Sequence, residues 1–246
     1  MKVVGVIPAR LKSTRLPNKV LKDICGRTMI EHVWKKCIDA HSLDEVVIAT
    51  DAKEVFDIAT GFGATVLMTS EKHQSGTERL IEVNENLKAD FYVNIQGDEP
   101  LISPNVIDEL VQCWKEDQAN HVYTAANPNI EEDDIYSPNV VKVVINKRFD
   151  ALYFSRSPIP YFRNQLGGAI SMKHIGIYGY TPKALEMFAK YSSGPLESTE
   201  VLEQLRFLEN GIPIRVFITN YNSIGIDTEE DLHKVRAIMN NDKGER

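Results

Sequence analysis

A basic segment near the amino terminus carries the side chains best suited to bind phosphate groups. Five cations and no acidic residue lie between residues 9 and 22 of a chain whose formal net charge is -7: Arg10, Lys12, Arg15, Lys19 and Lys22. Ser13 and Thr14 add hydroxyl donors. Cations clustered in this way can bind a polyanion such as a nucleoside triphosphate. A solvated surface turn is the alternative interpretation of a run of charges.

The residues that precede this segment favour phosphate binding. Residues 3 to 7 form a short, β-branched apolar run, which predicts a buried parallel strand. Residues just past the carboxyl end of such a strand face the crevice where open α/β sheets bind ligands. Neither a glycine-rich dinucleotide motif nor a GxxxxGK[ST] loop follows the strand. We therefore expect the segment to bind phosphate mainly through its side chains.

Two further carboxylates lie beside predicted elements that suggest a role in metal binding. Asp98 follows a glycine just beyond a predicted buried strand at residues 91 to 95, where a carboxylate is well placed to hold a divalent cation. Asp227 precedes Thr228 and Asp231, which resemble a helix capping box. The acids of this second cluster could simply favour the positive end of a helix dipole. Asp227 lies before the cap and is less easily explained in that way.

A small polar cluster at residues 75 to 77 opens a helix predicted to run to about residue 87. Ser75 or Thr77 could be no more than an N-cap. This helix follows the third predicted strand, and its start opens on the same sheet edge as the basic segment. This position is compatible with contact to a ligand bound at that edge.

Predicted strands and helices alternate over the first 68 residues, which is typical of βαβ units and a parallel sheet. The expected fold class is α/β and Rossmann-like, with a mostly parallel central sheet flanked by helices. Residues 1 to 246 are expected to form a single domain, with an inserted β-rich lobe at residues 138 to 180. Within this lobe we expect a hairpin and a further strand. Residues 131 to 137 are expected to form a loop, and residues 198 to 210 a single helix.

The amino-acid composition limits the classes of protein to which this chain could belong. Hydrophobic residues make up 43% of the chain and charged residues 26%, which is typical of a soluble globular protein. No apolar run approaches the roughly 18 residues of a membrane span. A sequence pI near 5.5 and a single basic segment argue against nucleic-acid binding. Cys25, Cys37 and Cys113 form no C-x-x-C pair, so we expect reduced thiols in a cytoplasmic protein.

Seven segments, in order along the chain, resemble the sugar-acid cytidylyltransferase family. They are residues 7–19, 73–79, 96–100, 153–156, 174–180, 202–206 and 225–228. The resemblance implies a nucleotide-diphospho-sugar transferase type of fold and CMP transfer from CTP to the anomeric hydroxyl of an eight-carbon acidic sugar. That sugar would be 3-deoxy-manno-octulosonate (Kdo), pyrophosphate would be released, and the product would serve lipopolysaccharide or capsule biosynthesis.

Other functions stay open at this point. The loop before His174 is shorter than the family pattern, and residues 196 to 199 lie where the family varies. The acceptor could therefore be 8-amino-Kdo, a sialic-acid-like sugar or a phosphonate. A catalytically silent CTP-binding protein is the alternative from another class. It predicts the loss of a metal carboxylate or of Lys19, and all of these residues are present.

The resemblance also implies roles for individual residues. The residues implied to be catalytic are Arg10, Arg15, Lys19, Asp98 and Asp227, of which Asp98 and Asp227 would bind Mg²⁺ and the cations would hold the β- and γ-phosphates. The residues implied to contact CTP are Pro8, Ala9, Arg10, Ser13, Arg15, Lys19, Ser75, Gly76, Thr77 and Gln96. The residues implied to contact the sugar are Gln96, Arg156, His174, Tyr178, Glu203 and Gln204.

The residues implied to contact the acceptor sugar could also have purely structural roles. His174 could be a satisfied polar group at the start of a strand, and Glu203 and Gln204 could lie on a solvated helix face.

The lobe at residues 138 to 180 carries several aromatic side chains that so small a lobe can hardly bury alone. We therefore expect a homodimer formed through this lobe.

Overall fold

A computed structural model describes residues 1–11, 16–73, 75–117, 119, 121–161, 163 and 171–244, with side chains up to residue 241. The chain forms two compact units. Unit 1 comprises Met1–Asp108 and Ser223–Arg246, and unit 2 comprises Glu109–Asn222. The boundary falls within helix α4 (Pro104–Asp117). The units are described separately below.

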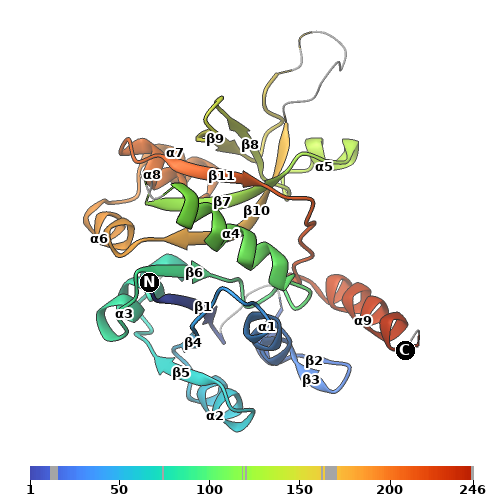
Figure 1. Ribbon diagram of the computed structural model, residues 1–246. Coiled ribbons are helices and arrows are strands. Elements are labelled where there is room, and N and C mark those ends of the chain that lie inside the picture. Colours follow the sequence, from blue (N-terminus) through green and yellow to red (C-terminus); the bar gives the residue numbers. More distant parts are fainter. Residues whose placement is uncertain are drawn as a thin grey trace. The chain divides into compact units, whose positions relative to one another are not determined.

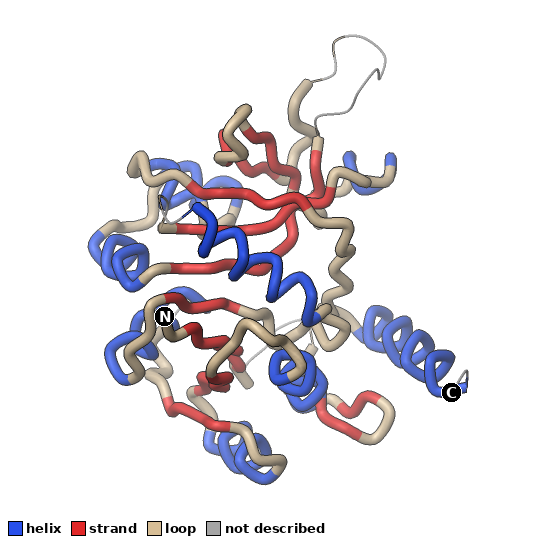
Figure 2. The backbone as a smooth tube through the Cα atoms, viewed as in Figure 1, coloured by secondary structure: helices blue, strands red, loops and turns tan. Residues whose placement is uncertain are grey.

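Unit 1 is built on four parallel strands in the order β6, β1, β4, β5 (Figures 1 and 2). These strands are β1 (Val3–Ala9), β4 (Glu45–Thr50), β5 (Thr65–Met68) and β6 (Phe91–Asn94). The helices that connect them are α1 (Met29–Ile38), α2 (Lys53–Gly61) and α3 (Gly76–Asn86). The alternation predicted from the sequence, and with it the α/β fold class, is confirmed.

The strand register determines which residues meet at one edge of this sheet. Ala9 at the end of β1 pairs with Thr50 at the end of β4, and Val6 pairs with Asn94 at the end of β6. All residues of β1 except Pro8 are buried, as the continuous apolar run predicts for a central parallel strand. The residues that follow β1, β4 and β6 therefore emerge together.

The carboxyl-terminal helix α9 (Glu229–Gly244) packs on the segment that follows β1 (Figure 1). This segment contains the short helix η1 (Lys19–Leu21) and a hairpin of β2 (Asp23–Ile24) and β3 (Arg27–Thr28). Leu232 and Val235 of α9 share a buried cluster with Leu16 and Ile24. This packing brings the two ends of the sequence together within unit 1.

Unit 2 contains a mixed sheet with a hairpin. Strand β7 (Val122–Asn127) pairs in parallel with β11 (Ile214–Ile218) and antiparallel with β10 (Met172–Tyr180). Strand β10 also pairs with β8 (Lys142–Ile145), which forms the predicted hairpin with β9 (Ala151–Ser155). The helices of this unit are α5 (Glu132–Tyr136), α6 (Pro182–Lys190), α7 (Pro195–Glu200) and α8 (Leu205–Glu209). Residues 138 to 180, which were predicted to form an inserted lobe, contain β8, β9 and β10, of which β10 also pairs with β7.

Two local predictions in unit 2 are wrong. Residues 131 to 137 contain the short helix α5, whose first turn holds three acids that favour the positive end of its dipole. The helix predicted for residues 198 to 210 is two helices, because Val201 adopts the left-handed conformation with φ 54° and ends α7. Gly211, with φ +70°, follows the end of α8 as predicted for a helix terminus. No helix in the described part of the chain is long and apolar enough to cross a membrane.

Candidate active site

Three loops of unit 1 meet beside Pro8, at the end of β1. A Cβ atom added to Gly97 would lie 2.7 Å from the carbonyl oxygen of Pro8, so any larger residue there would collide with backbone. A Cβ atom added to Gly76 would lie 3.6 Å from Cγ of Pro8 and 3.5 Å from Nδ2 of Asn94. The segments after β1, before α3 and after β6 are therefore adjacent. Gly97 is required for this close approach.

The ammonium of Lys19 lies between the two carboxylates predicted to bind metal. Its Nζ donates to Oδ2 of Asp98 at 2.6 Å and to Oδ1 of Asp227 at 2.9 Å. Only 14% of the Lys19 side chain is exposed, against 31% for Asp98 and 46% for Asp227. Burial by itself would lower the pKa of Lys19, but the two carboxylates outweigh it and raise that pKa above its ordinary value. The lysine is therefore charged.

The backbone around Asp227 is fixed by a capping box. Oδ2 of Asp231 accepts the amide N–H groups of Asp227 at 3.1 Å and Thr228 at 3.0 Å, and the Thr228 hydroxyl at 2.8 Å. The Asp231 amide donates to Oγ1 of Thr228 at 3.2 Å, which completes the predicted box. Burial opposes ionisation of Asp231, but these hydrogen bonds lower its pKa below the ordinary value. The amide of Ile226 donates to the carbonyl of Asp98 at 3.0 Å and links the two carboxylate segments.

The two carboxylates suit a metal ion whose coordination is completed by oxygen atoms of the substrate. Asp98 and Asp227 approach closely enough to share one ammonium group. Among the described residues, no group of three or more His, Cys, Asp or Glu side chains could hold a metal. Mg²⁺ is commonly bound by one or two carboxylates together with substrate phosphates and water. Two carboxylates next to the basic segment that is predicted to bind phosphate fit that pattern.

The start of α3 is held by an N-cap that was considered from the sequence and by a buried arginine that was not predicted. Ser75 is the N-cap, and its Oγ accepts the Glu78 amide at 3.2 Å. Arg79 is completely buried and donates to Oδ2 of Asp51, directly after β4, and to Oγ1 of Thr69, directly after β5, at 2.6 Å. Arg79 therefore ties α3 to the ends of two strands. Its position in the motif at residues 73 to 79 was the only sequence signal for this role.

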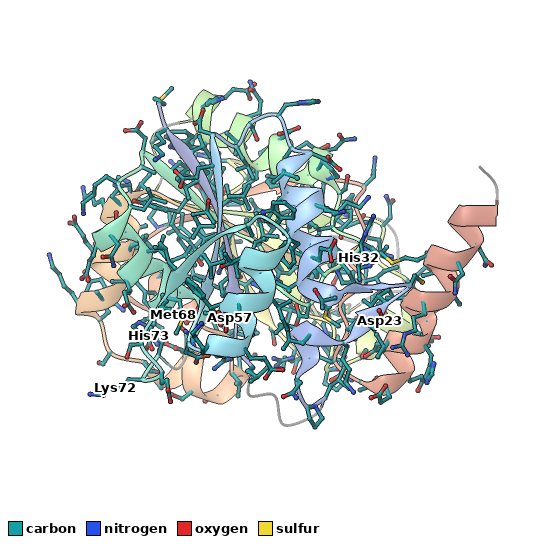
Figure 3. The ribbon with its side chains drawn as sticks, turned by 90° about the horizontal axis from the view of Figure 1, so that it is seen from below. Asp23, His32, Asp57, Met68, Lys72 and His73 are labelled. Carbon is teal, nitrogen blue, oxygen red and sulfur yellow. The ribbon has the colours of Figure 1, made fainter. Side chains whose placement is uncertain are left out.

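A second contact fixes the segment before α3. Nε2 of His73 lies 2.5 Å from Oε2 of Glu82, which also accepts the Ser70 amide at 2.8 Å. Figure 3 shows His73 and Lys72 near Met68, on the segment between β5 and α3. Burial would raise the pKa of Glu82, but the hydrogen bonds from Ser70 and His73 lower it below the ordinary value. The cluster at residues 75 to 77 is thus anchored on both sides.

The remaining residues predicted to contact CTP are placed as follows. Ala9 and Thr77 are buried, Arg10 is exposed just after β1, and Gln96 is partly exposed just after β6. Ser13 and Arg15 lie outside the described residues. The contacts of all these residues with CTP stay predictions.

In unit 2, a bulge in β10 brings two predicted acceptor residues together. The register against β7 shifts between Ile175 and Tyr178, so His174 pairs with Ala126 and Tyr178 with Thr124. The rings of His174 and Tyr178 are 5.4 Å apart, and Nε2 of His174 lies 3.1 Å from Oγ1 of Thr124. Although part of the histidine surface is exposed, desolvation lowers its pKa to about 3. The imidazole is therefore neutral near pH 7.

Tyr178 and Gln204 have the properties of hydrogen-bonding groups kept away from water. Burial raises the pKa of Tyr178 well above its ordinary value, with smaller contributions from Tyr180 and Glu203, so its phenol stays protonated. Gln204 is 7% exposed, and among the described residues its Nε2 has no hydrogen-bond partner. Buried polar groups normally have such a partner. A bound ligand could supply it.

Arg156 is engaged by backbone carbonyls. Its guanidinium donates to the carbonyls of Glu200 at 2.8 Å, Pro138 at 3.0 Å and Val201 at 3.4 Å. The Glu200 carboxylate in turn accepts the Arg156 amide at 2.9 Å and the Ser155 hydroxyl at 2.6 Å. Its predicted contact with a sugar carboxylate stays a prediction, and such a carboxylate would have to share the guanidinium with these carbonyls.

Lys142 extends this network and had no sequence signal. The side chain is fully buried, and Nζ donates to the carbonyls of Ser137 at 2.8 Å and Val140 at 2.7 Å, and to that of Arg156. Burial lowers its pKa, which the nearby Glu200 carboxylate partly opposes. The network fixes the segment that leads from α7 to Glu203 and Gln204.

Comparison with solved structures shows which known proteins share this fold. A structure described as CMP:2-keto-3-deoxy-manno-octonic acid synthetase complexed with CTP matches with a TM-score of 0.94 and 44% identity, over 98% of this chain and 100% of that chain. A 4-diphosphocytidyl-2C-methyl-D-erythritol synthase from Anaerococcus prevotii matches with a TM-score of 0.64 and 12% identity, over 97% and 98%. The second similarity shows a shared fold only.

Comparison of sequences gives the family. The cytidylyltransferase family model matches residues 4–217. A 3-deoxy-manno-octulosonate cytidylyltransferase from Geobacter metallireducens is 45% identical over 96% of this chain and 96% of its own length. An enzyme of the same name from Escherichia coli is 44% identical over 97% of this chain and 96% of its own length. The chain belongs to the 3-deoxy-manno-octulosonate cytidylyltransferase family.

Proposed function

We propose that this chain transfers CMP from CTP to the anomeric hydroxyl of 3-deoxy-manno-octulosonate and releases pyrophosphate. The observation that carries the proposal is the cluster of Lys19, Asp98 and Asp227 at the sheet edge where the loops around Pro8 and Gly97 meet. It is supported by 44% identity, over nearly the whole chain, to a synthetase solved with CTP. The product would supply lipopolysaccharide or capsule biosynthesis.

The reaction requires neutralisation of charge on the triphosphate. The oxygen of the acceptor hydroxyl forms a bond with the α-phosphorus and releases its proton to solvent. The bond from that phosphorus to the bridging oxygen breaks, and pyrophosphate leaves with the electron pair. Arg10 and Lys19 would bind the β- and γ-phosphates and stabilise the charge that develops on the leaving group. When bound by Asp98 and Asp227, Mg²⁺ would supply Lewis-acid stabilisation of the phosphate oxygens.

The acceptor would be recognised by neutral hydrogen-bonding groups in unit 2. His174 and Tyr178 remain uncharged near pH 7, and Gln204 has a buried amide nitrogen to satisfy. Such groups suit sugar hydroxyls, because an analogue that lacks a hydroxyl would leave a buried partner unpaired. Arg156 is the proposed partner of the sugar carboxylate.

The direct test is pyrophosphate release with Mg²⁺ and CTP against a panel of acidic acceptors. We expect rapid release with Kdo, and release with sialic acid or a phosphonate that is lower by about 10²-fold or more, because missing hydrogen bonds to buried groups are costly. ATP, GTP and UTP with Kdo measure nucleotide preference. Release with another acceptor at an equal or higher rate would overturn the assignment of Kdo. Specific CTP binding without release on any acceptor would support a catalytically silent protein.

We also infer a homodimer formed through the lobe at residues 138 to 180. The exposed fractions of Leu152 on β9 and Phe149 before it are 60% and 47%, and that of Tyr161 is 89%. Exposed apolar groups on one small lobe favour contact with a second copy. Sedimentation equilibrium should give about twice the chain mass of 27.8 kDa, and Leu152→Glu should shift the species towards the single chain. A wild type that stays at the mass of one chain at micromolar concentration would exclude this dimer.

We infer a cytoplasmic location as well. Cys25, Cys37 and Cys113 form no disulfide bond in the described part of the chain, and burial raises the pKa of Cys113 to about 11, which keeps that thiol protonated and unreactive. Free thiols are typical of reducing compartments. Fractionation of cells that express the chain, with a periplasmic marker as control, tests this location.

A further inference from the structure

Lys19 occupies the place between the carboxylates that would bind the metal ion. The ammonium is within 3 Å of an oxygen of each carboxylate, at 2.6 Å from Asp98 and 2.9 Å from Asp227. It is the least exposed of the three side chains. A divalent cation bound to the same oxygens would compete with this ammonium for the ligands and would be repelled by it.

The three residues lie on separately fixed segments. Lys19 begins η1, which is closed by the Lys22 amide donating to the Lys19 carbonyl at 3.1 Å. Asp227 is held by the Asp231 capping box, and the Asp98 carbonyl accepts the Ile226 amide. Two carboxylates held this close repel each other unless a cation lies between them. A long, flexible lysine side chain can supply that cation and can leave without movement of the backbone.

Resting on the proposed function, we propose that Lys19 is an internal counter-ion, exchanged for the metal ion when nucleotide binds. In the free protein the ammonium neutralises Asp98 and Asp227 and opposes metal binding. The triphosphate offers the same ammonium a stronger set of anionic oxygens, so nucleotide binding draws Lys19 away and frees both carboxylates. Metal and nucleotide then bind with positive coupling, and by linkage each strengthens the other equally. The enzyme would thereby avoid holding a metal ion without its substrate.

The test measures binding of Mn²⁺ alone to the full chain, without nucleotide, from the loss of the free-ion electron paramagnetic resonance signal. Lys19→Met removes the competing charge, so its Mn²⁺ dissociation constant should fall by about ten- to a hundredfold relative to wild type. Lys22→Met is the matched control, since Lys22 lies three residues away and pairs with Glu229 at 3.0 Å instead. Its dissociation constant should change by less than about twofold, because a more distant, exposed charge is screened.

A second variant and a stability measurement test whether misfolding causes any change in Mn²⁺ affinity. Lys19→Gln keeps a hydrogen-bond donor without the charge, and it should bind Mn²⁺ more tightly than wild type, as Lys19→Met does. Thermal denaturation in EDTA establishes that each variant is folded before the metal is added. If folded Lys19→Met and Lys19→Gln bind Mn²⁺ no more tightly than wild type or Lys22→Met, the counter-ion exchange is wrong.

The double variants Lys19→Met/Asp98→Asn and Lys19→Met/Asp227→Asn separate this inference from the proposed function. Each should lose the tight Mn²⁺ binding of Lys19→Met, because a charged ligand is removed. Tight binding that survives in both double variants would place the metal elsewhere, and would overturn the metal site of the proposed function together with the exchange. A different result would overturn the counter-ion exchange alone. In that result, wild type binds Mn²⁺ through Asp98 and Asp227, but Lys19→Met binds it no more tightly than wild type.

Discussion

Replacing Asp98 or Asp227 by asparagine should lower turnover by about 10²- to 10⁴-fold, because each change removes one charged metal ligand from a reaction that depends on charge neutralisation. Asparagine is nearly isosteric with aspartate, so packing is retained. Initial rates of pyrophosphate release at saturating CTP and Kdo measure the effect. We expect the loss mainly in kcat, since charge stabilisation is greatest in the transition state.

The fold should survive both substitutions. The side chains of Asp98 and Asp227 are 31% and 46% exposed, and their pairs with Lys19 are open to solvent on one side. The capping box that starts α9 uses the Asp231 carboxylate and the Asp227 backbone amide, which Asp227→Asn leaves in place. Glu229→Gln, in the first turn of the same helix, is the control and should retain activity. Turnover close to wild type in both aspartate variants would refute a metal site built from these carboxylates.

Arg79→Met should destabilise the protein by about 3–5 kcal/mol, because it breaks a buried ion pair and leaves the partner charge without compensation. The guanidinium is fully buried and donates to Asp51, to Oγ1 of Thr69 at 2.6 Å and to the carbonyl of Ser70 at 3.5 Å. For a chain of this size, each kcal/mol lowers the melting temperature by roughly 2–4 °C. Calorimetry should therefore show a decrease of about 6–20 °C.

A double variant distinguishes a lost pair from a simple loss of packing. Asp51→Leu/Arg79→Met removes both charges, and it should be more stable than Arg79→Met alone, because no uncompensated carboxylate remains. Lys53→Met removes an exposed partner of Asp57 and should barely change the melting temperature. A double variant less stable than Arg79→Met would show that Arg79 contributes by packing. CTP binding should weaken in Arg79→Met, since Arg79 anchors the start of α3.

Much of unit 1 follows from the sequence because its signals are local and periodic. Short apolar runs alternating with helical periods predict parallel strands, and parallel strands place the residues after β1 and β6 at one edge. The shared location of Arg10, Gln96 and Asp98 could thus be predicted. The Thr228 and Asp231 capping box was also predictable, because its partners lie three residues apart.

Unit 2 shows where such signals fail. The run from residue 198 to 210 has helical periodicity, but Val201 adopts a left-handed conformation that propensity would not predict for a β-branched residue. The network of Lys142, Arg156 and Glu200 fixes the segment around this break. Contacts between residues distant in sequence therefore override the local helical preference at Val201. They also occupy the guanidinium of Arg156, which the family motif alone assigned to a substrate.

By itself, the sequence determined the α/β class, the family and the residue types available for phosphate and metal binding, because these depend on periodicity and on motifs. Only the tertiary structure decided that Lys19 lies between Asp98, 79 residues away, and Asp227, 208 residues away. It also revealed that Arg79 reaches Asp51 and that Gly97 lies against the backbone of Pro8. Such partners are selected by the packing of whole elements, which fixes the few positions where a buried charge finds its counter-charge.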